Sequence, residues 1–199
     1  MNNASRRIAT LLLVVFTCAS AAYGDIIPID LLGQAGPGLL PGNETGAVNG
    51  TPGSGGEVGS GITFDNVTLQ LTINIGWGSG NGFTDLTGNA TVGHIHGPTG
   101  SPPPTAFEQA ASPLIDLHTL PGWNNSATNG GFSNTIMLTS QQATFLNEGR
   151  LYINVHTTQN GPGEIRGNLV VVPEPGTFVS LLLGAGALAL LRRWRVARD

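Results

Sequence analysis

The residues in this chain that could do chemistry are its histidines. His94 and His96 lie two residues apart in the segment GHIHG, and His156 follows much later in NVHT. Side chains two residues apart on a β-strand project from the same face, so His94 and His96 should point the same way. A strand pairing that places NVHT beside GHIH would gather three imidazoles, a ligand set that suits zinc or copper. The spacing predicts a zinc or copper site of His94, His96 and His156.

The same spacing has a second interpretation, in which the histidines are structural. Their rings would then hydrogen-bond to backbone groups at the edge of a sheet. A metal site would need a fourth ligand, or a partner that orients the ligating rings, and Asp116 and Glu164 are the candidates. The two interpretations differ in whether the three rings converge.

Other reactive groups form no recognisable arrangement. The only cysteine, Cys18, falls in an N-terminal segment that we expect to be removed, so the mature chain offers no thiol, disulfide or cysteine-based metal site. The sequence has no G-x-S-x-G nucleophile motif and no phosphate-binding loop, and its acidic residues are scattered. We therefore expect no enzyme activity, with a metalloenzyme that uses the three histidines as the alternative.

Charge limits the partners of this chain. It contains no lysine, and residues 25–172 hold ten acidic residues against two arginines, a net charge of −8. Binding to nucleic acid requires a basic patch, so the composition excludes a nucleic-acid partner. An exported polysaccharide could instead bind to exposed aromatic side chains, and Trp77, Phe83 and Trp123 are the candidates for such a platform.

The elements that must position the histidines are short strands. Residues 69–75 alternate between apolar and polar side chains, which predicts the clearest strand, and residues 62–64 form the other arm of its hairpin. The segment TSQQATFLNEG predicts one helix that is capped by Thr139 or Ser140 and stops at Gly149. Further short strands are predicted over residues 26–32, 91–96, 113–117, 135–138, 150–157 and 164–172.

These elements predict an all-β fold, an antiparallel β-sandwich with one short helix, over residues 25–172. Residues 33–61 contain 11 glycines and are expected to form long turns. On the last strand, Glu164 and Arg166 share a face, and the simplest interpretation is an ion pair worth about 0–1 kcal/mol if exposed.

Both ends of the chain look like export signals. Residues 1–24 carry Arg6 and Arg7 before an apolar run and small residues, the layout of a secretory signal peptide. Residues 173–199 contain an apolar run that would span roughly 21 Å as a helix, which is short of the ~30 Å bilayer core unless flanking arginines extend it. The positive-inside rule keeps both arginine clusters in the cytoplasm, so residues 25–172 would lie outside the inner membrane.

The C-terminal segment resembles a known sorting signal. A Pro-Glu-Pro turn, an apolar helix and an arginine cluster follow one another as in the PEP-CTERM signal of Gram-negative bacteria; the residues concerned are Pro173, Glu174, Pro175, Arg192 and Arg193. The resemblance implies anchoring in the inner membrane, processing by an exosortase, and delivery to the cell surface or extracellular matrix. The alternative is a permanent single-span anchor.

The middle of the chain resembles the CHRD domain, first described in the animal protein chordin. The similarity lies in VGHIHGPTG, LTSQQATFLNEG and RLYINVHTTQNGPGEIRGNL, covers roughly residues 34–171, and is looser in its first half. It implies a β-sandwich, immunoglobulin-like or superoxide-dismutase-like, without established enzyme activity. The motif positions it marks are His94, His96, Gly97, Asn154, His156, Glu164 and Arg166. Copper–zinc superoxide dismutase is similar in its HxH strand, but this chain lacks that enzyme's cysteine pair and full ligand set.

The sequence therefore predicts an exported, non-enzymatic domain of the bacterial surface or extracellular matrix. Its expected partners are the export machinery and an exosortase, with exopolysaccharide or surface proteins as candidate ligands. A histidine-based zinc or copper domain and an exopolysaccharide-binding module are the alternatives.

Overall fold

The computed structural model describes residues 25–124 and 127–172, and the single residue 184. The signal peptide predicted over residues 1–24 lies outside the described residues. The C-terminal helix predicted within residues 173–199 does too, apart from residue 184. In the part of the chain that is described, no helix is long and apolar enough to cross a membrane.

The described residues form one antiparallel sheet of ten strands. Its order is β6-β5-β9-β10-β1-β3-β4-β8-β7, and β2 pairs with β4 outside that path. The strands are β1 (Ile26–Leu32), β2 (Gly55–Glu57), β3 (Ile62–Asp65), β4 (Gln70–Trp77), β5 (Ala90–His96), β6 (Pro113–Asp116), β7 (Trp123–Asn124), β8 (Gly130–Met137), β9 (Leu151–Thr157) and β10 (Ile165–Val171). The all-β prediction is confirmed.

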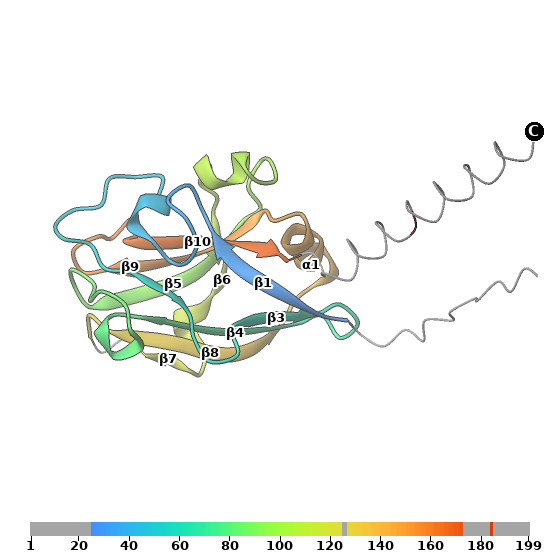
Figure 1. Ribbon diagram of the computed structural model, residues 1–199, viewed down its shortest axis with the longest axis horizontal. Coiled ribbons are helices and arrows are strands. Elements are labelled where there is room, and N and C mark those ends of the chain that lie inside the picture. Colours follow the sequence, from blue (N-terminus) through green and yellow to red (C-terminus); the bar gives the residue numbers. More distant parts are fainter. Residues whose placement is uncertain (1–24, 125–126, 173–183, 185–199) are drawn as a thin grey trace, which may run out of the picture.

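The sheet curls so that two layers enclose a core. One layer holds β5, β9 and β10, the other holds β3, β4 and β8, and β1 crosses between them (Figure 1). Each layer contributes alternate side chains; Leu71 and Ile73 of β4 and Ile153 and Val155 of β9 are all fully buried. Burial of each such side chain stabilises the fold by about 1.5–3 kcal/mol. The predicted sandwich is therefore made by one continuous sheet that curls into two layers.

The predicted hairpin near residue 70 is present. Thr63 of β3 faces Thr72 of β4, and the carboxylate of Asp65 accepts hydrogen bonds from the backbone of Val67 and Thr68 at 2.9 Å each. Leu69 has a positive φ of 59° and belongs to the turn, so β4 begins one residue later than the alternation suggests.

The predicted helix is also present, as α1 (Ser140–Asn147). Thr139 and Gln142 form a capping box, in which each side chain accepts a backbone hydrogen bond from the other residue, at 3.2 and 2.8 Å. The helix ends at Asn147, and Gly149, two residues on, has a φ of 68° that favours glycine. Because α1 joins β8 to β9, its sharp ends set where β9 starts and hence where His156 lies.

Two strands were missed and one is longer than predicted. Neither β2, which reads Gly-Gly-Glu, nor the two-residue β7 has an alternating pattern. β8 begins at Gly130, five residues before the predicted start, and its first glycines lie close against the neighbouring strand β4. A Cβ on Gly131 would lie 2.6 Å from the Ile75 carbonyl oxygen, so only glycine fits this close approach.

Candidate metal centre

The histidines lie on the outer face of the β5–β9 pair. In β5, Ile95 is fully buried in the core, so His94 and His96 on either side of it point away from the core. β9 pairs with β5 in a register that places His94 opposite Asn154 and Val92 opposite His156. His156 is therefore diagonal to His94 across the two strands, within reach of its ring.

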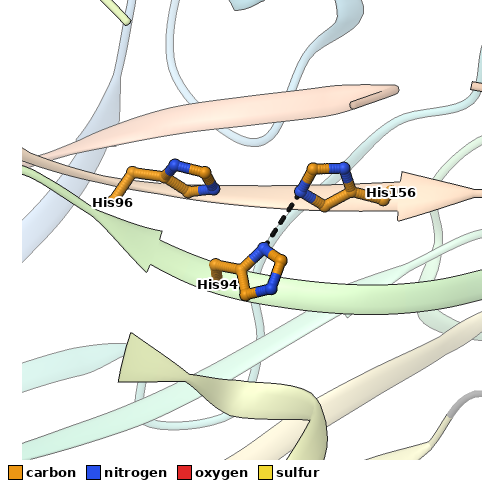
Figure 2. Close-up of side chains that lie close together, drawn as sticks. All are labelled: His94, His96 and His156. Atoms are coloured by element: carbon orange, nitrogen blue, oxygen red, sulfur yellow. Dashed lines mark hydrogen bonds between the residues drawn. The ribbon is translucent and has the colours of Figure 1, made fainter. Parts of the chain in front are cut away.

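The structure brings the three predicted histidines together. His94 Nδ1 lies 3.1 Å from His156 Nε2, and the ring of His94 is 5.2 Å from that of His96 between centroids. One nitrogen from each of His94, His96 and His156 lies within 4.8 Å of the other two (Figure 2). The rings thus converge, as the metal interpretation requires.

Backbone carbonyls orient two of the rings. His96 Nδ1 lies 2.8 Å from the carbonyl oxygen of Ala111, and His156 Nδ1 lies 2.7 Å from that of Gly161. A carbonyl only accepts, so each Nδ1 carries the proton and each Nε2 carries the lone pair that a metal needs. The buried Nε2 of His96 has no hydrogen-bond partner among the described residues, which is uncommon for a buried polar atom and calls for an explanation.

Burial keeps the rings uncharged. It lowers the pKa of His96 to about 4, against the opposing effect of the Ala111 carbonyl. Burial and the neighbouring His156 also lower the pKa of His94, although Asp116 opposes them. The pKa of His156 is lowered mainly by burial too. At neutral pH all three imidazoles are therefore in the form that binds metal ions.

The side chains of His96, Tyr152 and Arg166 form a stack. The ring of His96 stacks on that of Tyr152, with centroids 4.8 Å apart and an interplanar angle of 9°. The guanidinium of Arg166 lies over the same tyrosine ring, 3.6 Å from its centroid. The Tyr152 hydroxyl accepts from the Ala111 amide and donates to its carbonyl, at 3.0 and 3.1 Å. These two hydrogen bonds fix the loop between β5 and β6 and hold the Ala111 carbonyl beside His96.

Gly97 allows the chain to turn directly after His96. Its φ of 149° is rare for other residues, and a Cβ there would lie 2.4 Å from Leu151 Cδ2 and 2.9 Å from the carbonyl oxygen of Arg150. This motif residue therefore has a backbone role.

Asn154 connects the histidine face to a buried carboxyl group. Its Nδ2 donates to Glu44 Oε1 at 2.7 Å. Burial raises the pKa of Glu44 to about 7, although Arg166 and this hydrogen bond lower it. Nothing in the sequence pattern pointed to Glu44, because it comes from the glycine-rich segment that we expected to form turns.

The predicted ion pair of Glu164 and Arg166 is wrong. Both residues are fully buried, and neither is bonded to the other among the described contacts. Arg166 donates to the Ala106 carbonyl and to Asn168 Oδ1 at 3.1 and 3.2 Å. Glu164 accepts from Gly53, Thr87, Thr157 and Asn160. A buried charge needs hydrogen bonds, and these two side chains find theirs with different partners.

Glu164 therefore does not lie among the histidines as a fourth ligand. The carboxylate that does is Asp116, whose Oδ1 is 3.5 Å from His94 Nε2. The fourth histidine, His118, lies beside the same ring at 5.2 Å between centroids. Its position was missed because it depends on the pairing of β5 with β6, which sets His94 opposite Asp116.

The three candidate aromatic rings do not form one exposed platform. Trp77 is fully buried in the core and packs on Trp123 with ring centroids 5.0 Å apart. Trp123 and Phe83 are half-buried. Trp77 and Trp123 therefore belong to the core, whereas Phe83 lies apart from it.

Comparison with protein families decides the classification. The family model described as the CHRD domain matches residues 39–169, well over half of the chain. The chain belongs to the CHRD domain family. The fold extends beyond the match, because β1 pairs with both β10 and β3. No curated protein and no solved structure was found to match the chain.

A second family model, described as the PEP-CTERM protein-sorting motif, matches residues 171–196. This match covers the predicted sorting residues, among them Pro173 and Arg192. It indicates exosortase-dependent export and membrane-anchored sorting of the kind found in Gram-negative bacteria. Neither matched family is an enzyme family.

Proposed function

We propose that this protein is a non-enzymatic CHRD domain of the cell surface or extracellular matrix that binds one zinc or copper ion through His94, His96 and His156. The observation that carries the proposal is the convergence of three ring nitrogens within 4.8 Å. Two of these rings are already oriented by carbonyl groups, as is typical of metal-bound histidines.

The proton positions fit this ligand set. His96 and His156 would bind through Nε2, since each Nδ1 donates to a carbonyl. His94 would bind through Nδ1, which faces His156, and its proton would then sit on Nε2 and point to Asp116. An imidazole that donates to a carboxylate is a better metal ligand. Three imidazoles without a thiolate suit zinc or copper(II).

The ion would act as a cross-link. His94 and His96 come from β5, whereas His156 comes from β9 and is tied to the loop that leads into β10. An exported domain of this sequence has no cysteine for a disulfide, and an ion that binds only the folded state stabilises it by RT ln(1 + [L]/Kd). This would hold the domain together outside the cell.

The metal half of the proposal is tested by thermal unfolding with and without added zinc or copper(II). The protein is expressed as the full chain and recovered after export. Zinc at 100 times its Kd should stabilise the wild type by about 2.7 kcal/mol, and His156→Gln should abolish most of that gain. All four histidines lie in this region, so the matched control is the exposed Asp30→Asn. Equal stabilisation of wild type and His156→Gln would contradict the proposal.

The sorting half is tested by the mass of the mature protein. Exosortase processing near Pro173–Pro175 should remove the arginine-rich tail, so a surface-located form should lack residues 192–199. Recovery of the intact tail on the surface form would favour a permanent anchor instead.

A further inference from the structure

His94 has two neighbourhoods, one for each ring nitrogen. Its Nδ1 faces His156, as described above. Its Nε2 faces Asp116 Oδ1 at 3.5 Å, and the ring of His118 stands edge-on to it with an interplanar angle of 89°. One ligand atom from each of His94, Asp116 and His118 lies within 4.8 Å of the other two. The ring therefore belongs to two groups of potential ligands.

The second group is built by local structure. Asp116 ends β6 directly opposite His94, and the short 3-10 turn η4 (Leu117–Thr119) follows at once. Leu117 is fully buried, which fixes this turn against the core and holds His118 beside β5. The Thr119 hydroxyl donates to the Asp116 carbonyl at 2.9 Å and closes the turn.

His118 presents a free lone pair to this group. Its Nδ1 lies 3.3 Å from the carbonyl oxygen of Gly93, which can only accept. Nδ1 therefore carries the proton and Nε2 carries the lone pair. This is the arrangement already seen at His96 and His156, so three of the four rings are oriented in the same way by backbone carbonyls.

The distances suit an ion better than a direct hydrogen bond. Ligand atoms bound to tetrahedral zinc at about 2.0–2.1 Å lie about 3.3 Å apart. The 3.5 Å between His94 Nε2 and Asp116 Oδ1 is close to that spacing and long for a hydrogen bond. The side chain of Asp116 is 58% exposed, against 13% for His94, so an ion can reach the group from solvent.

We propose that His94, Asp116 and His118 form a second zinc or copper site and that His94 bridges the two ions through its two ring nitrogens. This rests on the proposed function, since the bridge requires the first site. The second ion replaces the proton on His94 Nε2, which passes to solvent. The carboxylate of Asp116 and the imidazolate of His94 then balance part of the added charge.

The test counts metal ions by elemental analysis after dialysis of the exported full chain against zinc. The wild type should hold two ions. His118→Gln and Asp116→Asn should each hold one, and His96→Gln should also lose one, because it affects only the first site. Asp30→Asn, an exposed aspartate on β1, is the control and should keep both. Folding of each variant is checked by circular dichroism.

The outcomes separate the two proposals. One ion in the wild type that His118→Gln and Asp116→Asn leave in place would overturn the second site and leave the first intact. Retention of every ion by His96→Gln and His156→Gln would overturn the proposed function itself. With copper(II), a bridged pair should show a weakened electron paramagnetic resonance signal that His118→Gln restores to that of a single ion. A full signal from two bound ions would overturn the bridge.

Discussion

Two buried polar clusters of this domain contain its motif residues, and they differ in how completely they are hydrogen-bonded. Glu164 accepts from two backbone amides and from three side-chain groups, at 2.5–3.2 Å. At the histidines, His96 uses only one ring nitrogen, and its Nε2 has no hydrogen-bond partner among the described residues; the second nitrogen of His156 meets only the ring of His94, at 3.1 Å.

The difference separates a structural role from a binding role. Burial would raise the pKa of Glu164, but hydrogen bonds from Thr87, Gly53 and Thr157 lower it. The Glu164 carboxylate therefore links three loops to the start of β10 through its hydrogen bonds. Burial lowers the pKa of His94, His96 and His156, and their converging nitrogens have few partners: His94 Nδ1 and His156 Nε2 meet each other, and His96 Nε2 meets none among the described residues. A saturated cluster stabilises a fold, whereas an unsaturated one is ready to bind a ligand.

The largest expected effect is on stability, from Glu164→Ala. It leaves several buried donors without an acceptor, so the free energy of unfolding should fall by about 3 kcal/mol. Urea unfolding of the metal-free protein measures this. The zinc affinity of the folded protein should stay unchanged. Loss of zinc binding at unchanged stability would reverse the roles assigned to the two clusters.

The next effect is the pH dependence of metal binding. Ordinary histidines bind protons instead of metal below pH 6.5. Here burial lowers the three pKa values, that of His96 to about 4, so zinc release should be centred below pH 6.5. Titration calorimetry at a series of pH values tests the prediction. Release centred on pH 6.5 would show that the rings are not shielded.

The lowered histidine pKa values also affect the stability of the metal-free protein. Between pH 4 and 6.5 the unfolded chain binds more protons at these histidines than the folded one, so their contribution to stability rises with pH.

The smallest expected effect is the pH dependence of stability that Glu44 causes. It has the opposite sign to that of the histidines. The Glu44 pKa of about 7 lies above the ordinary value of 4.5, so the folded state binds more protons and stability falls as the pH rises from 4.5 to 7. Glu44→Gln should remove this decline, a change of about 1–2 kcal/mol after allowance for solvent screening. Urea unfolding at pH 5 and pH 7.5 measures it. An unchanged pH slope in Glu44→Gln would contradict the assignment.

Local patterns in the sequence predicted much of the fold. The alternation in β4, the capping box at Thr139 and the common face of His94 and His96 depend on neighbours a few residues away. The short β2 and β7 have no such pattern, so they were missed.

Pairings between distant segments could not be predicted in the same way. The place of Asp116 and His118 beside His94 depends on the register of β5 with β6, and Glu44 reaches Asn154 from a distant loop. The separation of Glu164 from Arg166 has the same origin in part, because distant loops supply some of their partners: Gly53 and Thr87 for Glu164, and Ala106 for Arg166. Spacing within one strand showed which side chains share a face, but not what covers that face.

The most direct test of the central claim is the nitrogen NMR spectrum of the imidazole rings, before and after one equivalent of zinc. In the metal-free protein His96 and His156 should both carry their proton on Nδ1. Zinc should then shift His96 Nε2, His156 Nε2 and His94 Nδ1 together. Protons on Nε2 of His96 and His156, or resonances that zinc leaves unmoved, would contradict the account.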